Sequence, residues 1–189
     1  MKSFLALVFF FLQFSLLAQK DCEYSTNVTD TLGTYKTTPD YLMSEKIFAG
    51  KSAYLFFSLV NEDGTPFLKV QLIQKSNEFI KATCLDGNSK IYLQLVNGKI
   101  ITLLHTNTEN CGTMLWIEEE KMNTRITAGN FMFMKGTIED LKASPVSMVR
   151  VKYLTETVDY VMKKEFVSEL LKTTLYPENY FVNYLKCID

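Results

Sequence analysis

The sequence predicts an α+β fold: a mainly antiparallel β-sheet that could curl into a barrel, a short internal helix, and C-terminal helices packed on the sheet. Three observations predict it. Short runs of β-branched and aromatic residues recur between turn signals, apolar and polar residues alternate within them, and two apolar stripes with helical spacing follow Phe166. The sequence shows no repeat or linker, so residues 19–189 are expected to form a single β-rich domain.

The first 18 residues are typical of a secretory signal peptide. Lys2 precedes an apolar run from Phe4 to Leu17, and Ala18 supplies a small residue at the expected cleavage site. Such a signal would direct export of the chain to the periplasm or the extracellular space, with cleavage after Ala18 removing residues 1–18. No later stretch approaches the ~20 apolar residues of a membrane helix, so no transmembrane anchor is expected. With 20 basic and 21 acidic residues, the chain also lacks the charge excess of nucleic-acid-binding proteins.

The polar, Thr-rich segment from Gln19 to Asp40 is weakly patterned and is expected to wrap over the surface. Strands dominate from Tyr41 onward, and Glu62 to Pro66 form a turn whose Asp-Gly pair connects two of them. Asn97-Gly98 predicts a two-residue type I′ hairpin. The expected strands cover residues 52–61, 67–74, 91–96, 99–104, 113–119, 124–134, 146–153 and 157–162.

Helical signals occupy two regions. Thr137 to Asp140 resembles a capping box, which predicts a short helix that ends at Ala143, before Pro145. Apolar residues at helical spacing predict one helical arm from Phe166 to Leu175 and, after Pro177, a second from Tyr180 to Ile188.

Four cysteines in an exported chain predict two disulfides, for which sequence alone allows three connectivities. In the expected hairpin Val96 faces Lys99, and the same alignment carried outward places Cys84 opposite Cys111. We therefore expect Cys84–Cys111, which leaves Cys22–Cys187 to join the two ends. The cysteine spacings contain no Cys-x-x-Cys pair and the chain has one histidine, so no metal site is expected.

Candidate catalytic residues are few, and no catalytic or cofactor site is predicted. His105 has no motif that supplies a nucleophile and an orienting acid, which favours an ordinary hydrogen-bonding role. The run from Glu118 to Glu120 lacks the glycine of a calcium loop and is typical of a solvated strand end. Arg150 lies between Val149 and Val151 and points to the opposite face from them. Such a residue can bind an anion, but more commonly it simply faces water. Phe56 and Phe131 belong to aromatic strands that either line an apolar ligand cavity or form core.

The layout resembles uncharacterised secreted proteins of Bacteroidota. The features that carry the resemblance are the Leu-Leu-Ala-Gln that ends the signal, Asn110-Cys111-Gly112, Val149-Arg150-Val151 and the terminal Leu185-Lys186-Cys187-Ile188. The resemblance implies export and fold and assigns no activity. Asp30-Thr31-Leu32 is similar to the O-glycosylation signal of exported proteins in that group, which makes Thr31 a candidate glycosylation site.

The leading functional hypothesis is an exported, non-catalytic binding or structural protein of the cell envelope, with a protein or another envelope component as its partner. One alternative is a carrier of an apolar small ligand within the sheet, suggested by the aromatic strands. A further alternative is a hydrolase that uses Asp or Glu carboxylates, which would need two facing acids in a cleft.

Overall fold

The computed structural model describes residues 21–31, 33–106 and 108–188, and the predicted signal peptide at 1–18 lies outside them. Eleven strands form one antiparallel sheet in the order β1-β2-β4-β5-β9-β7-β6-β10-β11, with β3 paired to β4 and β8 paired to β9. The predicted fold class is confirmed, and the sheet remains open rather than closing into a barrel. The strands are β1 (Thr26–Asp30), β2 (Gly33–Thr37), β3 (Tyr41–Phe48), β4 (Lys51–Glu62), β5 (Thr65–Ser76), β6 (Lys90–Leu95), β7 (Ile100–His105), β8 (Thr113–Ile117), β9 (Met122–Phe133), β10 (Val146–Lys152) and β11 (Thr157–Val161).

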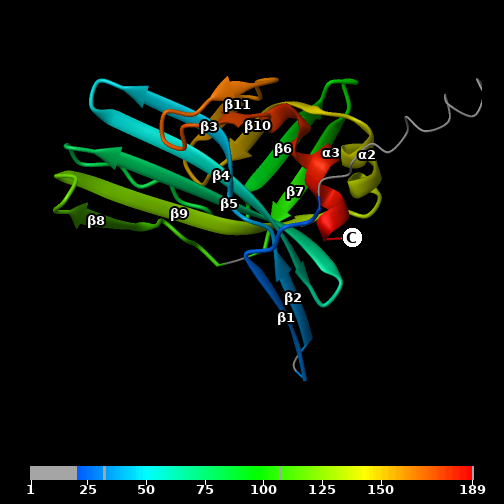
Figure 1. The fold of residues 1–189 in the computed structure, drawn as a ribbon. Coiled ribbons are helices and arrows are strands. Elements are labelled where there is room, and N and C mark those ends of the chain that lie inside the picture. Colours follow the sequence, from blue (N-terminus) through cyan, green and yellow to red (C-terminus); the bar gives the residue numbers. More distant parts are fainter. Residues whose placement is uncertain (1–20, 32, 107, 189) are drawn as a thin grey trace, which may run out of the picture.

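The long strands β4, β5 and β9 run through the middle of the molecule, and the sheet branches at both of their ends (Figure 1). Near one end β4 pairs with β3 and β9 pairs with β8; near the other end β4 pairs with β2 and β9 pairs with β7. The strands β6, β7, β10 and β11 continue the sheet on the side of β9. The three long strands therefore connect the two ends of the molecule.

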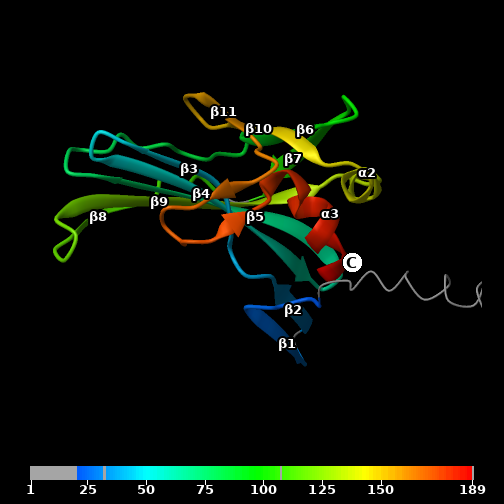
Figure 2. The ribbon, with the colours of Figure 1, turned by 45° about the horizontal axis from the view of Figure 1, so that its top comes forward.

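Side chains on one face of the sheet form the main core. Leu55, Phe57 and Leu59 of β4 alternate with residues of the other face and lie opposite buried residues of β5. The C-terminal segment covers this face with η2 (Pro177–Asn179), α3 (Tyr180–Tyr184) and η3 (Leu185–Cys187), while α2 (Thr137–Ala143) lies beside α3 (Figure 2). Phe181 is fully buried, with its ring centroid 6.2 Å from that of Phe57. Burying a side chain of this size contributes roughly 1.5–3 kcal/mol.

The hairpin of β4 and β5 has the predicted Asp-Gly turn. Glu62 pairs with Thr65, which leaves Asp63 and Gly64 as the two turn residues. Their φ angles of 50° and 80° are both positive, as a type I′ turn requires. This turn matches the right-handed twist of the long strands that it joins.

The Asn97-Gly98 hairpin forms, but its predicted register is wrong by one residue. Leu93 pairs with Ile101, and a turn closes from the Gly98 amide to the Leu95 carbonyl at 3.0 Å. Only Gly98 has a positive φ, at 87°, so the loop is a three-residue turn with a glycine bulge rather than type I′. The extra loop residue keeps Leu93 and Ile101 together on the buried face.

The N-terminal segment, expected to wrap over the surface, instead forms the β1–β2 hairpin, which projects from the body (Figures 1 and 2). Thr26 pairs with Thr37 at its base and Asp30 pairs with Gly33 at its tip. Three of the five residues of β1, Thr26, Val28 and Thr29, are β-branched, which suits a strand even when all five are exposed.

The predicted helical arm from Phe166 to Leu175 is wrong: this segment is a two-stranded hairpin of β12 (Phe166–Val167) and β13 (Thr174–Leu175). The carboxylate of Glu45 in β3 accepts hydrogen bonds from the amides of Glu169 and Leu170, both at 2.9 Å. The side chain of Glu45, distant in sequence, therefore binds two amides of the segment in which the sequence predicted a helix.

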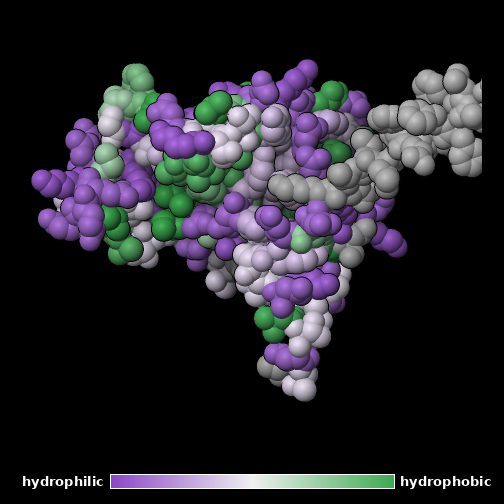
Figure 3. Space-filling view, viewed as in Figure 1, coloured by the Kyte–Doolittle hydropathy of each residue, from purple (hydrophilic) through white to green (hydrophobic). Residues whose placement is uncertain are grey.

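The second face of the sheet carries a smaller apolar cluster, in which Leu175 of this hairpin packs with Leu42 and Tyr54. Figure 3 shows hydrophobic side chains gathered in the middle of the view, over the region where Figure 1 draws β3, β4 and β5. The C-terminal segment therefore contributes to both faces of the sheet.

The internal helix α2 has the predicted bounds, but Thr137 is not its N-cap. Gly136, with a φ of 82°, holds that position, and the Thr137 hydroxyl donates to the Met134 carbonyl at 2.7 Å. Across the described residues, no helix combines the length and apolar character needed to cross a membrane.

Candidate functional site

Both disulfides expected from the sequence are present. Cys22 is bonded to Cys187 over a sequence separation of 165, and Cys84 is bonded to Cys111 over a separation of 27. Next to the second bond, Leu85 and Asn110 form an isolated antiparallel bridge. Two disulfides are compatible with an exported protein.

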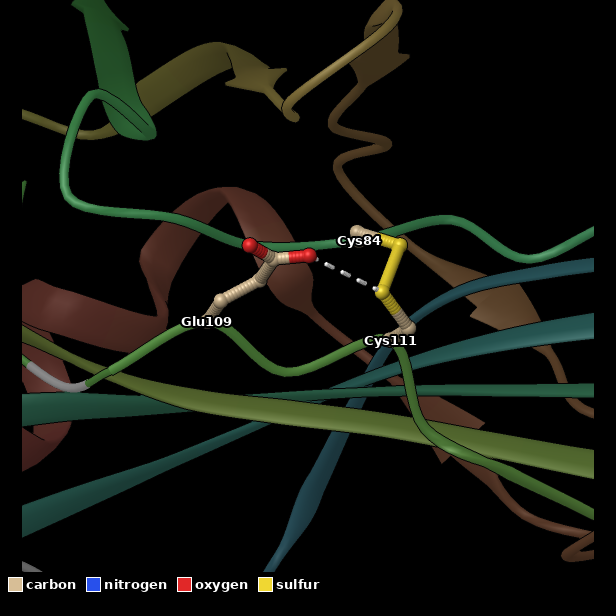
Figure 4. A group of neighbouring side chains, drawn as sticks. All are labelled: Cys84, Glu109 and Cys111. Atoms are coloured by element: carbon tan, nitrogen blue, oxygen red, sulfur yellow. Dashed lines mark hydrogen bonds between the residues drawn. A yellow bond between two sulfur atoms is a disulfide. The ribbon is translucent and has the colours of Figure 1, made fainter.

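The Cys84–Cys111 disulfide has an acidic neighbour. Figure 4 shows the carboxylate of Glu109 directed at the bond, with Oε1 3.6 Å from Cys111 Sγ. The ligand atoms of these three residues lie within 4.8 Å of one another. Because the two sulfur atoms are bonded to each other, neither is the thiolate that a metal ion would need. The cluster thus offers a single carboxylate.

His105 has the environment of a structural residue. Its Nδ1 lies 2.9 Å from the Asp86 carbonyl, which can only accept, so Nδ1 carries the proton. Its ring is buried, 5.2 Å from the Phe131 ring between centroids, and Nε2 has no hydrogen-bond partner. Burial lowers the pKa of His105, against the opposing effect of Asp86. The neutral ring thus packs against Phe131 of β9 and is bound to the loop that precedes β6.

The other polar candidates lie on the surface. Glu118 accepts from the Trp116 indole at 2.6 Å, and Glu120 pairs with Lys75, so the acidic run forms the solvated β8–β9 turn. Arg150 makes a two-pronged ion pair with Asp159, at 2.6 and 2.7 Å. That pairing raises the pKa of Arg150 and lowers the pKa of Asp159.

Thr31 lies at the exposed tip of the β1–β2 hairpin, where a modifying enzyme could reach it. Its glycosylation stays a prediction. Among the aromatic candidates, Phe131 is fully buried in the main core, and Phe56 is half-buried and packs against the smaller cluster on the other face.

The structure also assembles a site that the sequence did not suggest. Three segments distant in the chain enclose a hollow of about 190 Å³, which we call the tyrosine pocket. The N-terminal segment, the β2–β3 connection with the start of β3, and helix α3 supply its lining. The lining residues are Asp21, Glu23, Thr38, Pro39, Asp40, Tyr41, Tyr180 and Tyr184.

The three tyrosines of the pocket contact one another. The ring centroids of Tyr41 and Tyr180 are 5.1 Å apart, those of Tyr41 and Tyr184 are 5.6 Å apart, and those of Tyr180 and Tyr184 are 5.4 Å apart. The Tyr41 hydroxyl accepts the Tyr176 amide at 2.7 Å. Burial raises the pKa of Tyr41 and outweighs that hydrogen bond, which acts in the opposite direction.

Two local contacts hold the walls of the pocket. Thr38 is bound to Leu59 of β4 twice, through its amide and through its side-chain oxygen, both at 2.9 Å. Asp21 and Glu23 flank Cys22, whose disulfide to Cys187 fixes the N-terminal segment beside the end of α3. The Tyr24 hydroxyl adds a hydrogen bond to the Cys187 carbonyl at 2.9 Å.

Tyr180 has an unusual position in this pocket. Its side chain is 1% exposed, and its hydroxyl completes no hydrogen bond with a described residue. Burial raises the pKa of Tyr180 far above the usual value, although the nearby Thr38 hydroxyl acts in the opposite direction. The phenol therefore keeps its proton at all ordinary pH values.

The pocket combines negative charge with aromatic surface. Three carboxylates line it, and none of the described residues in its lining is Lys, Arg or His. Aromatic ring faces and carboxylates both attract cations. Among the described residues, the carboxylates of this pocket do not form a group of three metal-type ligand atoms within 4.8 Å of one another, whereas Cys84, Glu109 and Cys111 do. This spacing favours an organic cation over a metal ion as the ligand of the pocket.

Sequence reasoning missed this pocket because its parts come from residues far apart in the chain. One signal was available: Tyr180 and Tyr184 stand four residues apart on the helix that precedes Cys187. The expected Cys22–Cys187 bond brings Asp21 and Glu23 to the same place. Comparison of the chain with family models, with curated proteins and with solved structures found no match to any of them.

Proposed function

We propose that this chain is an exported, non-catalytic binding protein of the cell envelope, and that the tyrosine pocket binds an organic cation. The observation that carries the proposal is the lining of that pocket, which has three carboxylates, three tyrosine rings and, among the residues that the structure describes, no basic side chain. The two disulfides support export, and one of them, Cys22–Cys187, supports a rigid site because it joins the ends of the chain beside the pocket.

The expected affinity is modest. A cation on an aromatic face gains ~0.5–2 kcal/mol, and an exposed ion pair contributes up to ~1 kcal/mol. Two ring contacts and two or three carboxylates would therefore give a small probe a dissociation constant of roughly 0.1–10 mM. A larger natural ligand or partner would add contacts outside the pocket.

The test compares choline with 3,3-dimethyl-1-butanol, which has nearly the same shape and no charge. Titration followed by NMR of the tyrosine rings should show saturable binding of choline and no binding of the alcohol. The double variant Glu23→Gln with Asp40→Asn should weaken choline binding about three- to tenfold, as expected for the loss of two exposed charges. The control variant Glu119→Gln, in the β8–β9 turn, should bind as the unaltered protein does. Equal binding of both probes would exclude charge recognition.

The hydrolase alternative gains no support from this pocket. A carboxyl that acts as a general acid needs apolar surroundings, whereas Asp21, Glu23 and Asp40 are all exposed.

A second candidate function is the carrier of an apolar ligand, and one observation favours it. A hollow of about 300 Å³ at the β3–β4 end of the sheet lies beside Phe48 and Phe79, which are 83% and 74% exposed. Exposed aromatic rings of this kind commonly mark an interaction site. The fluorescence of 1-anilinonaphthalene-8-sulfonate should fall with Phe79→Ser and stay unchanged with Val161→Ser, a residue of β11 that is also 74% exposed.

A further inference from the structure

The hollow beside Phe48 and Phe79 lies at one end of the main core face of the sheet. Ala53 of β4 and Gln74 of β5 line it and are register partners. Two residues further along each strand, and therefore on the same face, Leu55 pairs with Leu72, and both belong to the main core. A ligand in the hollow would therefore extend the apolar packing of the core.

The apolar part of the lining suits an aliphatic chain. Phe48 and Phe79 are exposed, and the adjacent Ile80 is buried. A ligand that covers the two rings removes apolar surface from water, which favours binding. The volume of about 300 Å³ lies at the lower end of the range of small-molecule sites, so the hollow is large enough for a short chain.

The charged part of the lining is cationic. Lys46, Lys51 and Lys75 line the hollow, and none of the described residues in its lining is acidic. Two of these lysines have carboxylate partners outside the lining: Lys51 lies 2.5 Å from Glu78, and Lys75 lies 2.6 Å from Glu120. These pairs offset two of the three positive charges. Lys46 forms no ion pair with a described residue, so its charge remains for a ligand.

The side chain of Lys46 is held beside the core. Its Nζ lies 5.4 Å from the centroid of the Tyr160 ring, and Tyr160 is a buried member of the main core. The adjacent Glu45 uses its carboxylate elsewhere, on the amides of Glu169 and Leu170. An anion bound to Lys46 would have an apolar ring on one side, where its charge is screened less than in bulk water.

We propose, resting on the second candidate function given above, that this hollow binds an amphipathic carboxylate. The aliphatic chain would lie against Phe48 and Phe79, and the carboxylate would accept a hydrogen bond from the ammonium group of Lys46. A neutral molecule with the same chain would fill the same space without that bond. A molecule with a cationic head would be repelled by the lysines. The charge of the lining thus selects the anion.

The test titrates octanoate, 1-octanol and octyltrimethylammonium into protein with ¹³C-labelled phenylalanine and follows the ring signals by NMR. Octanoate should bind about three- to tenfold more tightly than octanol, as expected for one charged contact at a partly exposed site, and the cation should bind most weakly. Lys46→Gln should remove most of the preference for octanoate and leave octanol binding unchanged. Lys135→Gln is the matched control: it removes the same charge from an exposed lysine next to α2 and should keep the preference.

The outcomes separate this inference from the candidate function on which it rests. Equal binding of octanoate and octanol would overturn the selection of an anion and leave an apolar carrier in place, whereas saturable binding of neither would overturn both. Binding to phosphatidylglycerol vesicles without saturable binding of octanoate would also overturn the proposal, because it would indicate a membrane surface as the partner. Phe79→Ser should weaken octanoate and octanol binding alike, and unchanged binding of both would exclude this hollow as their site.

Discussion

Removing the hydroxyl of Tyr180 is expected to stabilise the free protein. The ring of Tyr180 is buried against Tyr41, Phe57 and Tyr184, and Tyr180→Phe keeps that packing. A buried hydroxyl without a partner costs ~1–3 kcal/mol, part of which local relaxation recovers. We expect a gain of about 1 kcal/mol in the free energy of unfolding, or ~2–4 °C in Tm for a domain of this size.

The assay is urea unfolding followed by circular dichroism with both disulfides intact, so that the slope of the free energy against urea can be compared between variants. Tyr41→Phe is the matched control, because the Tyr41 hydroxyl accepts the Tyr176 amide at 2.7 Å. Its loss should cost ~0.5–1.5 kcal/mol. A loss of more than ~1 kcal/mol for Tyr180→Phe would refute the reasoning, since it would show that the hydroxyl is already satisfied, with Thr38 as the first partner to examine.

Three further perturbations have defined expectations. Replacing Cys22 and Cys187 with Ser should lower the free energy of unfolding by ~5 kcal/mol, the loop-closure entropy for a separation of 165. Replacing Cys84 and Cys111, with a separation of 27, should lower it by ~3.5 kcal/mol, and the urea midpoints of the two variants should follow that order. Gly129→Ala should cost ~1–3 kcal/mol because its Cβ would lie 2.6 Å from His105 Nε2, and a Tm unchanged within error would contradict this contact. Because the pKa of His105 is lowered in the folded state, the unfolded chain takes up its proton first. Stability should therefore fall as pH drops from the ordinary histidine value through the lowered one, and His105→Asn should lose that slope between pH 7 and 5.

The parts of the fold that follow local rules could be predicted from the sequence. The alternation of apolar and polar residues gives β5 its buried face, and Asp63-Gly64 provides the left-handed conformations that its turn requires. The Asn97-Gly98 pair predicted a turn correctly and its type wrongly, because Asn97 does not adopt a positive φ. Local preference fixes the presence of such a turn more firmly than its register.

The remaining features depend on contacts between distant residues. The segment from Phe166 to Leu175 has a helical apolar pattern, yet the carboxylate of Glu45 binds two of its amides and it forms a hairpin. The tyrosine pocket likewise needs Asp21, Tyr41 and Tyr180 at one place, which no local pattern encodes. The spacing of Tyr180 and Tyr184 and the expected pairing of the end cysteines were the signals that pointed toward it.

The Cys22–Cys187 bond turns nearly the whole chain into a covalent ring. A single proteolytic cut in an exposed turn, such as Asp63-Gly64, would open that ring without releasing a fragment. The nicked molecule would keep both halves attached and could keep its long strands paired. In a compartment that contains proteases, a protein built in this way would release a fragment from between these two cysteines only after a second cut.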